Sequence, residues 1–200
     1  MNEVEEFRER AQHAAKGRRV VVTGLGPVAP NGVGRQAFWE ALLAGRSGIA
    51  RIRSFDASIY PCQVAGEVKD FDPEAFMDGR RARRMARFSQ LAVAAAVLAV
   101  EDARLPLDAP GSSTRRGVCL GVSSNAMGLL EQEFAAFLKR DGRRASPFVA
   151  GAAFPHAAAA EVAVTCACQG PVTTISAGCA SGSTAIGHAF DEIRAGRADV

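Results

Sequence analysis

The 200-residue sequence contains no C-x-x-C pair, and its five cysteines are an odd number. A disulfide framework is therefore not expected, and the cysteine pattern favours a reducing compartment. Cys166 and Cys168 form a C-x-C pair, but no further cysteine or histidine at ligand spacing completes a metal site. We interpret these two cysteines as packing residues and expect no metal.

Long hydrophobic runs are also missing. No apolar stretch approaches the length of a membrane span, and residues 1–16 alternate acidic, basic and polar side chains where a signal peptide would have an apolar core. We therefore expect a cytoplasmic chain with no membrane partner, which starts with a flexible leader at residues 1–17.

A strong net charge is the third absence. The 24 Lys and Arg residues exceed the 21 Asp and Glu residues by only three, which is too small an excess to suggest nucleic-acid binding by itself. Two hundred residues with 48% hydrophobic content suffice for one well-buried domain. The composition is that of a soluble globular protein.

The most informative stretch runs from Pro171 to Phe190, where two periodicities meet at Cys179. The β-branched run 172–175 predicts a short buried strand, and the apolar spacing from Cys179 onward predicts a helix that ends at Gly196. Gly178 permits a tight bend between them, so Cys179 is expected in the first turn of the helix.

This position suits a nucleophilic cysteine. Unpaired N–H groups and the helix dipole favour an anion at a helix start, and a thiolate is an anion. The alternative is that Cys179 fills the core, because free cysteines are among the residues most often buried. A glycine-flanked strand end is a poor place to pack, so we favour the nucleophile.

The start of the chain offers a competing motif. A β-branched strand is expected at residues 18–23, and Gly24-x-Gly26-x-x-Ala29 after it matches a dinucleotide-binding fingerprint. Pro27 lies where the phosphate-binding helix should begin, and no second strand ending in an acidic residue follows at the required distance. We therefore place the nucleotide hypothesis below a structural role.

The remaining pattern alternates helices and strands. We expect helices at residues 36–43, 80–104, 127–139 and 155–168, a buried strand at 117–121, a further strand beginning at 198, and loops across 46–79. Arginines crowd the start of the second of these helices at positions 80, 81, 83, 84 and 87, where cations oppose the helix dipole. They suggest an anionic partner, and because no aromatic residues are interleaved among them we do not expect it to be nucleic acid.

Other candidate catalytic groups are weak. Ser123 lies in Gly-x-Ser-x-Asn, which lacks the second glycine of a nucleophile elbow. His188 follows Cys179 by nine residues on the expected helix, about 13 Å at ~1.5 Å per residue, so it is too far away to act as its base. His156 is interpreted as a helix-end or pocket-wall residue.

Four segments in this order resemble the 3-oxoacyl-[acyl-carrier-protein] synthases of fatty-acid and type II polyketide synthesis, members of the thiolase-like superfamily. The segments are RVVVTGLG from Arg19, FWEALLAGRSGI from Phe38, RMARFSQ from Arg84, and Gly170-Pro171 leading to CASG at Cys179. The resemblance covers residues 18–200. It implies an α/β fold that forms the N-terminal half of a layered αβαβα architecture, with a mixed sheet flanked by helices.

The resemblance also implies roles for particular residues. Cys179 matches the cysteine that carries the acyl chain as a thioester, and Ser124 matches an acyl-pocket position. Basic positions that contact acyl carrier protein in the family correspond to Arg80, Arg83, Arg84, Arg143 and Arg144. The implied partners are acyl carrier protein, acyl and malonyl thioesters, and a second subunit in a homodimer or a ketosynthase/chain-length-factor heterodimer; no cofactor is implied.

The relatives are about twice this length, and their second half supplies two histidines, a lysine and a glycine-rich gate. The 200 residues alone are therefore not expected to complete a condensation. Two alternatives remain open: a non-elongating acyltransferase of the same superfamily, and a non-catalytic chain-length subunit. Cys179 argues against the second alternative, because such subunits typically lack the cysteine.

Overall fold

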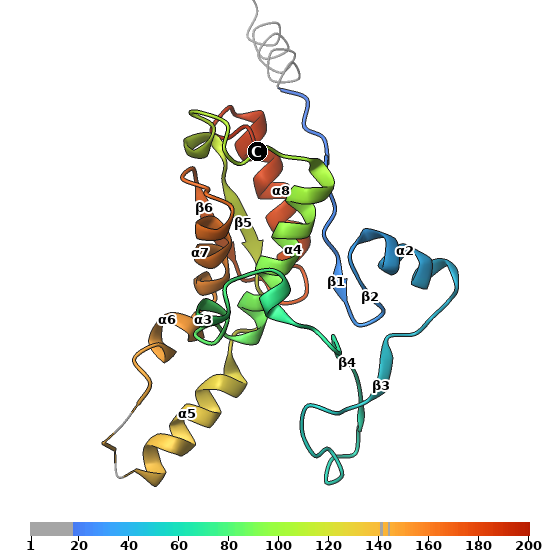
Figure 1. The fold of residues 1–200 in the computed structure, drawn as a ribbon, viewed down its shortest axis with the longest axis vertical. Coiled ribbons are helices and arrows are strands. Elements are labelled where there is room, and N and C mark those ends of the chain that lie inside the picture. Colours follow the sequence, from blue (N-terminus) through green and yellow to red (C-terminus); the bar gives the residue numbers. More distant parts are fainter. Residues whose placement is uncertain (1–17, 141, 144) are drawn as a thin grey trace, which may run out of the picture.

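A computed structural model describes residues 18–140, 142, 143 and 145–200, so the leader expected at 1–17 lies outside the described residues. The longer helices in Figure 1 include α4, α5 and α8. The helices are α2 (Arg35–Leu43), α3 (Gly79–Ala82), α4 (Arg87–Ala103), α5 (Met127–Lys139), α6 (Val149–Ala153), α7 (His156–Thr165) and α8 (Ser181–Arg194), with 3-10 turns at Pro73–Ala75 and Ser113–Arg115. The strands are β1 (Val28–Ala29), β2 (Gly32–Val33), β3 (Ile49–Arg51), β4 (Val64–Gly66), β5 (Val118–Gly121) and β6 (Val172–Ile175).

The parallel pair β5 and β6 forms the centre of the molecule (Figure 1). Val118 lies opposite Val172, and Gly121 lies opposite Ile175. Successive residues of a strand point to opposite faces. Cys119 therefore lies against α8, while Val118 packs on the cluster that α4 and α7 contribute. Helices thus cover both faces, and the α/β class expected from the sequence is confirmed.

Helices α4 and α7 pack against each other through small side chains. Val93 and Ala94 of α4 and Ala158 and Ala159 of α7 are completely buried. Small side chains let the two helix backbones approach closely, which explains the alanine-rich sequence of both helices. This helix pair is the support on which one face of the central strands rests.

The helix expected at 80–104 is in fact two helices. Asp78 begins α3 by accepting hydrogen bonds from the backbone N–H groups of Arg80 and Arg81. Ala86 then adopts an extended conformation, with ψ of 156°, and α4 begins at Arg87. The prediction of one continuous helix was wrong because a helical periodicity on both sides of a short break does not reveal the break.

The strand expected at 18–23 is not formed in the structure. Val21 and Val22 are exposed, and no segment within the described residues pairs with this stretch. Next to it, Gly24 and Gly26 lie directly on α4, where a Cβ atom on Gly26 would be 1.9 Å from the carbonyl oxygen of Ala95. These glycines therefore serve helix packing, which is the structural role preferred over dinucleotide binding.

Two small antiparallel sheets extend to one side of the central layer, together with α2 (Figure 1). The pair β1–β2 precedes α2, and β3–β4 lies within the stretch 46–79 that was expected to be mostly loop. The strand expected from residue 198 is limited to a few hydrogen bonds, among them one of 2.8 Å from the N–H of Gly117 to the carbonyl oxygen of Val200.

Candidate active site at Cys179

Cys179 lies in a turn between β6 and α8. It is an exposed, free cysteine, and the preceding Gly178 has φ of 56°, a conformation that favours glycine. Helix α8 begins at Ser181 with Ala180 as its N-cap, so Cys179 lies just before the helix and not within its first turn. The difference arises because the turn is closed by its own hydrogen bonds, from the N–H of Ala180 to the carbonyl oxygen of Ala177 and from the N–H of Ser181 to that of Gly178.

The side-chain hydroxyl of Ser181 also holds this turn, and the sequence did not predict that role. The hydroxyl of Ser181 accepts a hydrogen bond from the N–H of Ala177 at 2.8 Å and donates one to the carbonyl oxygen of Gly178 at 2.7 Å. The available signal was a serine at the start of a predicted helix, where serines commonly bind backbone groups.

The loop after β5 reaches the same edge of the sheet as the Cys179 turn. Parallel strands end at the same edge, and the register from Gly121 to Ile175 places both loops there. Ser124 is exposed in the β5 loop, between the end of β5 and the start of α5. The two site residues suggested by the resemblance, Cys179 and Ser124, therefore lie in neighbouring loops.

The other cysteines occupy different environments. Burial raises the pKa of the thiols of Cys119, Cys166 and Cys168 above the usual value, and Glu192 adds to the effect at Cys119. Cys62 is exposed, like Cys179, but lies in the β3–β4 connection and not between a strand and a helix. Among the five cysteines, Cys179 alone combines exposure with a strand-to-helix turn.

Neither histidine of the described residues belongs to the Cys179 turn. His156 is the exposed first residue of α7, and its ring stacks on Phe154 with centroids 5.5 Å apart. His188 lies inside α8, with its Nε2 3.7 Å from Oε1 of Glu192. Both have structural surroundings that account for them without a catalytic role.

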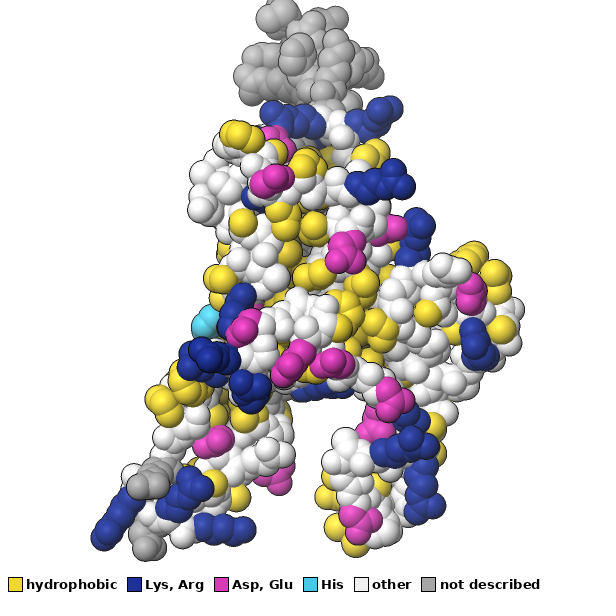
Figure 2. Space-filling view, in the orientation of Figure 1, with side chains coloured by type: hydrophobic (Ala, Val, Ile, Leu, Met, Phe, Trp, Pro, Cys, Tyr) yellow, Lys and Arg dark blue, Asp and Glu magenta, His cyan; other side chains and the backbone are white. Residues whose placement is uncertain are grey.

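Three of the five predicted carrier-protein arginines lie at α3 and directly after it, where Lys and Arg side chains gather on the surface (Figure 2). Arg80, Arg83 and Arg84 are exposed, and the guanidinium of Arg84 lies over the ring of Phe148, 4.5 Å from its centroid. Phe148 directly precedes α6. The contact therefore joins the segment after α3 to the α5–α6 loop, in which Arg143 is exposed; Arg144 lies outside the described residues.

Arg81 differs from its neighbours. Its Nη2 is 2.5 Å from Oε2 of Glu161 in α7, and this ion pair is half-buried. Arg81 therefore ties α3 to the helical layer, while the arginines around it remain on the surface.

No group of three or more His, Cys, Asp or Glu residues within the described part of the chain is placed to hold a metal ion. None of the helices in that part combines the length and the apolar character needed to cross a bilayer.

The chain matches known proteins over most of its length. Residues 17–200 match the family described as "Beta-ketoacyl synthase, N-terminal domain". The "3-oxoacyl-[acyl-carrier-protein] synthase 2" of Synechocystis sp. is 38% identical over 181 residues, which are 90% of this chain and 43% of that protein. The chain therefore spans less than half the length of this relative.

Two solved structures have similar folds. "The ishigamide ketosynthase/chain length factor" superposes with a TM-score of 0.79 and 32% identity, covering 91% of this chain and 45% of that one. The complex described as "AntDE:AntF (apo): type II PKS acyl-carrier protein in complex with its ketosynthase bound to the hexaketide" gives 0.75 and 26%, covering 91% and 49%. The family match over residues 17–200, together with these folds, shows that the chain belongs to the beta-ketoacyl synthase family and contains its N-terminal domain.

Proposed function

We propose that this chain is the N-terminal part of a 3-oxoacyl-[acyl-carrier-protein] synthase in which Cys179 accepts the acyl group. The observation that carries the proposal is the exposed Cys179 on a tight turn between a central parallel strand and α8. Such a turn presents the sulfur to a substrate while the N-terminus of the helix favours negative charge nearby.

The proposed reaction has two steps. The Cys179 thiolate attacks the carbonyl carbon of an acyl thioester, and the carrier thiol leaves as the new thioester forms. Malonyl-carrier protein then loses carbon dioxide, its enolate attacks the acyl-Cys179 carbonyl, and the cysteine thiolate is released with the 3-oxoacyl product. The backbone N–H of Cys179 would be one donor to the tetrahedral oxyanion. Such a donor lowers the activation barrier by about 3–4 kcal/mol.

The second oxyanion donor and the decarboxylation histidines are proposed to lie outside these 200 residues. His156 and His188 are both accounted for by contacts away from the Cys179 turn. Enolate stabilisation requires positioned donors, so the present chain would support acyl transfer without condensation.

Acyl carrier protein is the proposed macromolecular partner. The exposed guanidinium groups of Arg80, Arg83, Arg84 and Arg143 support it, because they offer positive charge to an acidic surface. Arg144 is included in the proposal from its place in the sequence.

A second subunit is proposed to pair along β6. Within the described residues β6 pairs with β5 alone, and Val172 at its start is exposed. An unpaired strand edge readily adds another strand, which supports a homodimer or a heterodimer with a chain-length-type subunit.

The test is to incubate the purified 200-residue chain with acyl- and malonyl-carrier protein and to analyse both proteins by mass spectrometry. We expect slow formation of acyl-Cys179, no 3-oxoacyl product, and no acylation of a Cys179→Ala control. Product formation at the rate of complete synthases would contradict the proposal. If a longer form of the protein forms acyl-Cys179 and never condenses, the non-elongating acyltransferase is the better assignment.

A further inference from the structure

The side chain of Ser181 is almost completely buried, unlike those around it. It is 2% exposed, whereas Gly182, Ser183 and Thr184, the next residues of α8, are exposed. A polar side chain is buried at little cost only when its hydrogen bonds are satisfied. Ser181 therefore has a defined set of partners, and these partners indicate what it does.

The hydroxyl of Ser181 binds backward along the chain. A serine that caps a helix accepts a hydrogen bond from an N–H group two or three residues further on. Ser181 instead accepts from the N–H of Ala177, four residues earlier, and donates to the carbonyl oxygen of Gly178. Its hydroxyl thus stabilises the turn that carries Cys179 and not the helix that follows.

The two bonded groups lie immediately before Cys179 in the sequence. The backbone of Ala177 and Gly178 determines the direction of the chain leading to Cys179, and the positive φ of Gly178 makes the turn there. A single hydroxyl that binds both residues fixes the backbone entering Cys179 relative to the first residue of α8. Cys179 is consequently held directly before the N-terminus of α8, where the helix dipole favours negative charge.

Ser181 is itself held from the opposite side. Gly121, the last residue of β5, packs directly against the Ser181 backbone. A Cβ atom at position 121 would overlap the carbonyl oxygen of Ser181. The strand fixes the position of the Ser181 backbone, and the Ser181 side chain fixes the turn. The chain of contacts runs from the central sheet to the nucleophile.

We propose that Ser181 is a positioning residue for Cys179, whose hydroxyl holds the cysteine turn in its reactive geometry. The inference rests on the proposed role of Cys179 as the nucleophile. It predicts that removing the hydroxyl lowers the reactivity of Cys179 without exposing the buried core.

The experiment compares Ser181→Thr, which keeps the hydroxyl, with Ser181→Val, which has nearly the same shape without it, and with Ser181→Ala. Ser183→Ala is the matched control, because it makes the same chemical change at an exposed position of the same helix turn. Each chain is treated with a limiting amount of iodoacetamide. The rates of modification at Cys179, Cys62 and Cys166 are then read by peptide mass spectrometry.

The measured quantity is the ratio of the Cys179 rate to the Cys62 rate within the same molecule. We expect Ser181→Val and Ser181→Ala to lower it about fivefold, the rate equivalent of one net hydrogen bond. Ser181→Thr and Ser183→Ala should stay near the parent value, and the buried Cys166 should remain slow throughout.

Two results would overturn the inference. One is an unchanged ratio in Ser181→Val and Ser181→Ala. The other is an equal fall in Ser181→Thr, or a fall accompanied by fast labelling of Cys166, which would assign Ser181 to general stability. If the Ser181 variants change the iodoacetamide ratio as expected but the parent chain forms no acyl-Cys179, the proposed function fails and the positioning role of Ser181 stands.

Discussion

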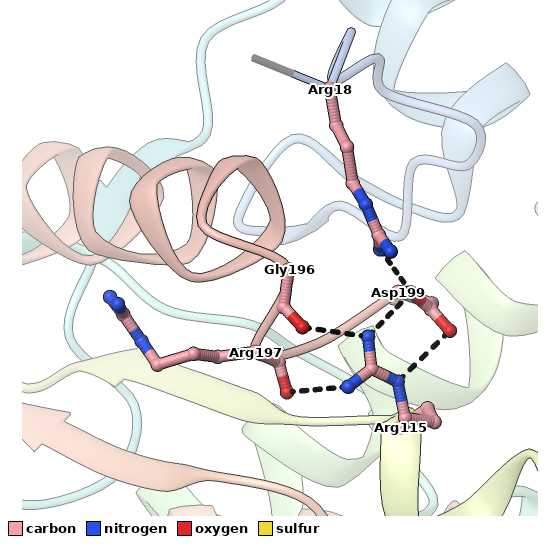
Figure 3. A network of polar contacts seen from close by, with 5 residues as sticks. All are labelled: Arg18, Arg115, Gly196, Arg197 and Asp199. Atoms are coloured by element: carbon pink, nitrogen blue, oxygen red, sulfur yellow. Dashed lines mark hydrogen bonds and ion pairs between the residues drawn. The ribbon is translucent and has the colours of Figure 1, made fainter. Parts of the chain in front are cut away.

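Arg115 and Asp199 form a two-point ion pair. The Nε and Nη2 atoms of Arg115 are 3.1 Å and 2.9 Å from the two carboxylate oxygens of Asp199 (Figure 3). Arg18 donates a further bond of 2.6 Å to the same carboxylate, and Arg115 also binds the carbonyl oxygen of Gly196. The network joins the segment before β1, the 3-10 turn that precedes β5 and the segment that follows α8.

This network predicts an acid-sensitive contribution to stability. Hydrogen bonds from Arg115 and Arg18 lower the pKa of Asp199 from 3.8 to about 2. Because the folded-state pKa is lower than the unfolded one, the contribution is complete above about pH 4 and is lost as the pH falls through about 2. Asp199→Asn should lower the melting temperature at neutral pH, and its difference from the parent should shrink over that interval.

Thermal unfolding followed by circular dichroism at a series of pH values measures this effect. Asp108→Asn, in the loop after α4, is the control and should leave the melting temperature almost unchanged at every pH. An Asp199→Asn difference that is independent of pH between 2 and 6 would show that the carboxylate charge is not the source of the stability.

The environments of the cysteines predict an order of labelling. Near neutral pH, Cys179 should be modified first by a limiting electrophile, and Cys119, Cys166 and Cys168 should be slow because burial raises their thiol pKa values. Cys62 is the internal comparison for an exposed cysteine outside the site. First modification of Cys62 or of a buried cysteine would remove the main support for Cys179 as the nucleophile.

Charge reversal tests the proposed carrier-protein surface. Arg83→Glu with Arg84→Glu should slow acyl transfer to Cys179 from carrier protein, and the loss should be larger at low salt, where exposed charges are least screened. Transfer from a small thioester should be largely spared, and Arg46→Glu, an exposed arginine after α2, is the remote control. Equal losses with both acyl donors would indicate a damaged fold.

The contact of Gly26 with α4 predicts a large difference between two Gly→Ala substitutions. A Cβ atom on Gly26 would meet the backbone of Ala95 and Ala99, so Gly26→Ala should destabilise the chain by about 1–3 kcal/mol. Gly187→Ala in α8 meets no atom within 4 Å and should stabilise its helix by up to about 1 kcal/mol. Chemical unfolding of the two variants would measure the difference, and equal stabilities would contradict the close packing.

The local sequence correctly predicted the elements that have a clear hydrophobic pattern and, for strands, a neighbouring strand to pair with. The strand at 172–175, the turn at Gly178 and the helix after Cys179 all follow from short-range patterns, and the structure confirms them to within about two residues. The strand expected at 18–23 is absent because a strand requires a partner, and β-branched residues cannot specify one. The bonds of Ser181 were missed because they depend on where two backbone groups lie after folding.

The close approach of Gly121 to α8 affects how sequence variation in this protein should be interpreted. Any side chain at position 121 would displace the first residues of α8. Even Gly121→Ala would therefore disturb the backbone that supports the Cys179 turn. A survey of random substitutions would then score position 121 as intolerant as Cys179, the proposed nucleophile, although position 121 carries no reactive atom. Intolerance to substitution in this region would therefore mark the residues that support the Cys179 turn as well as Cys179 itself.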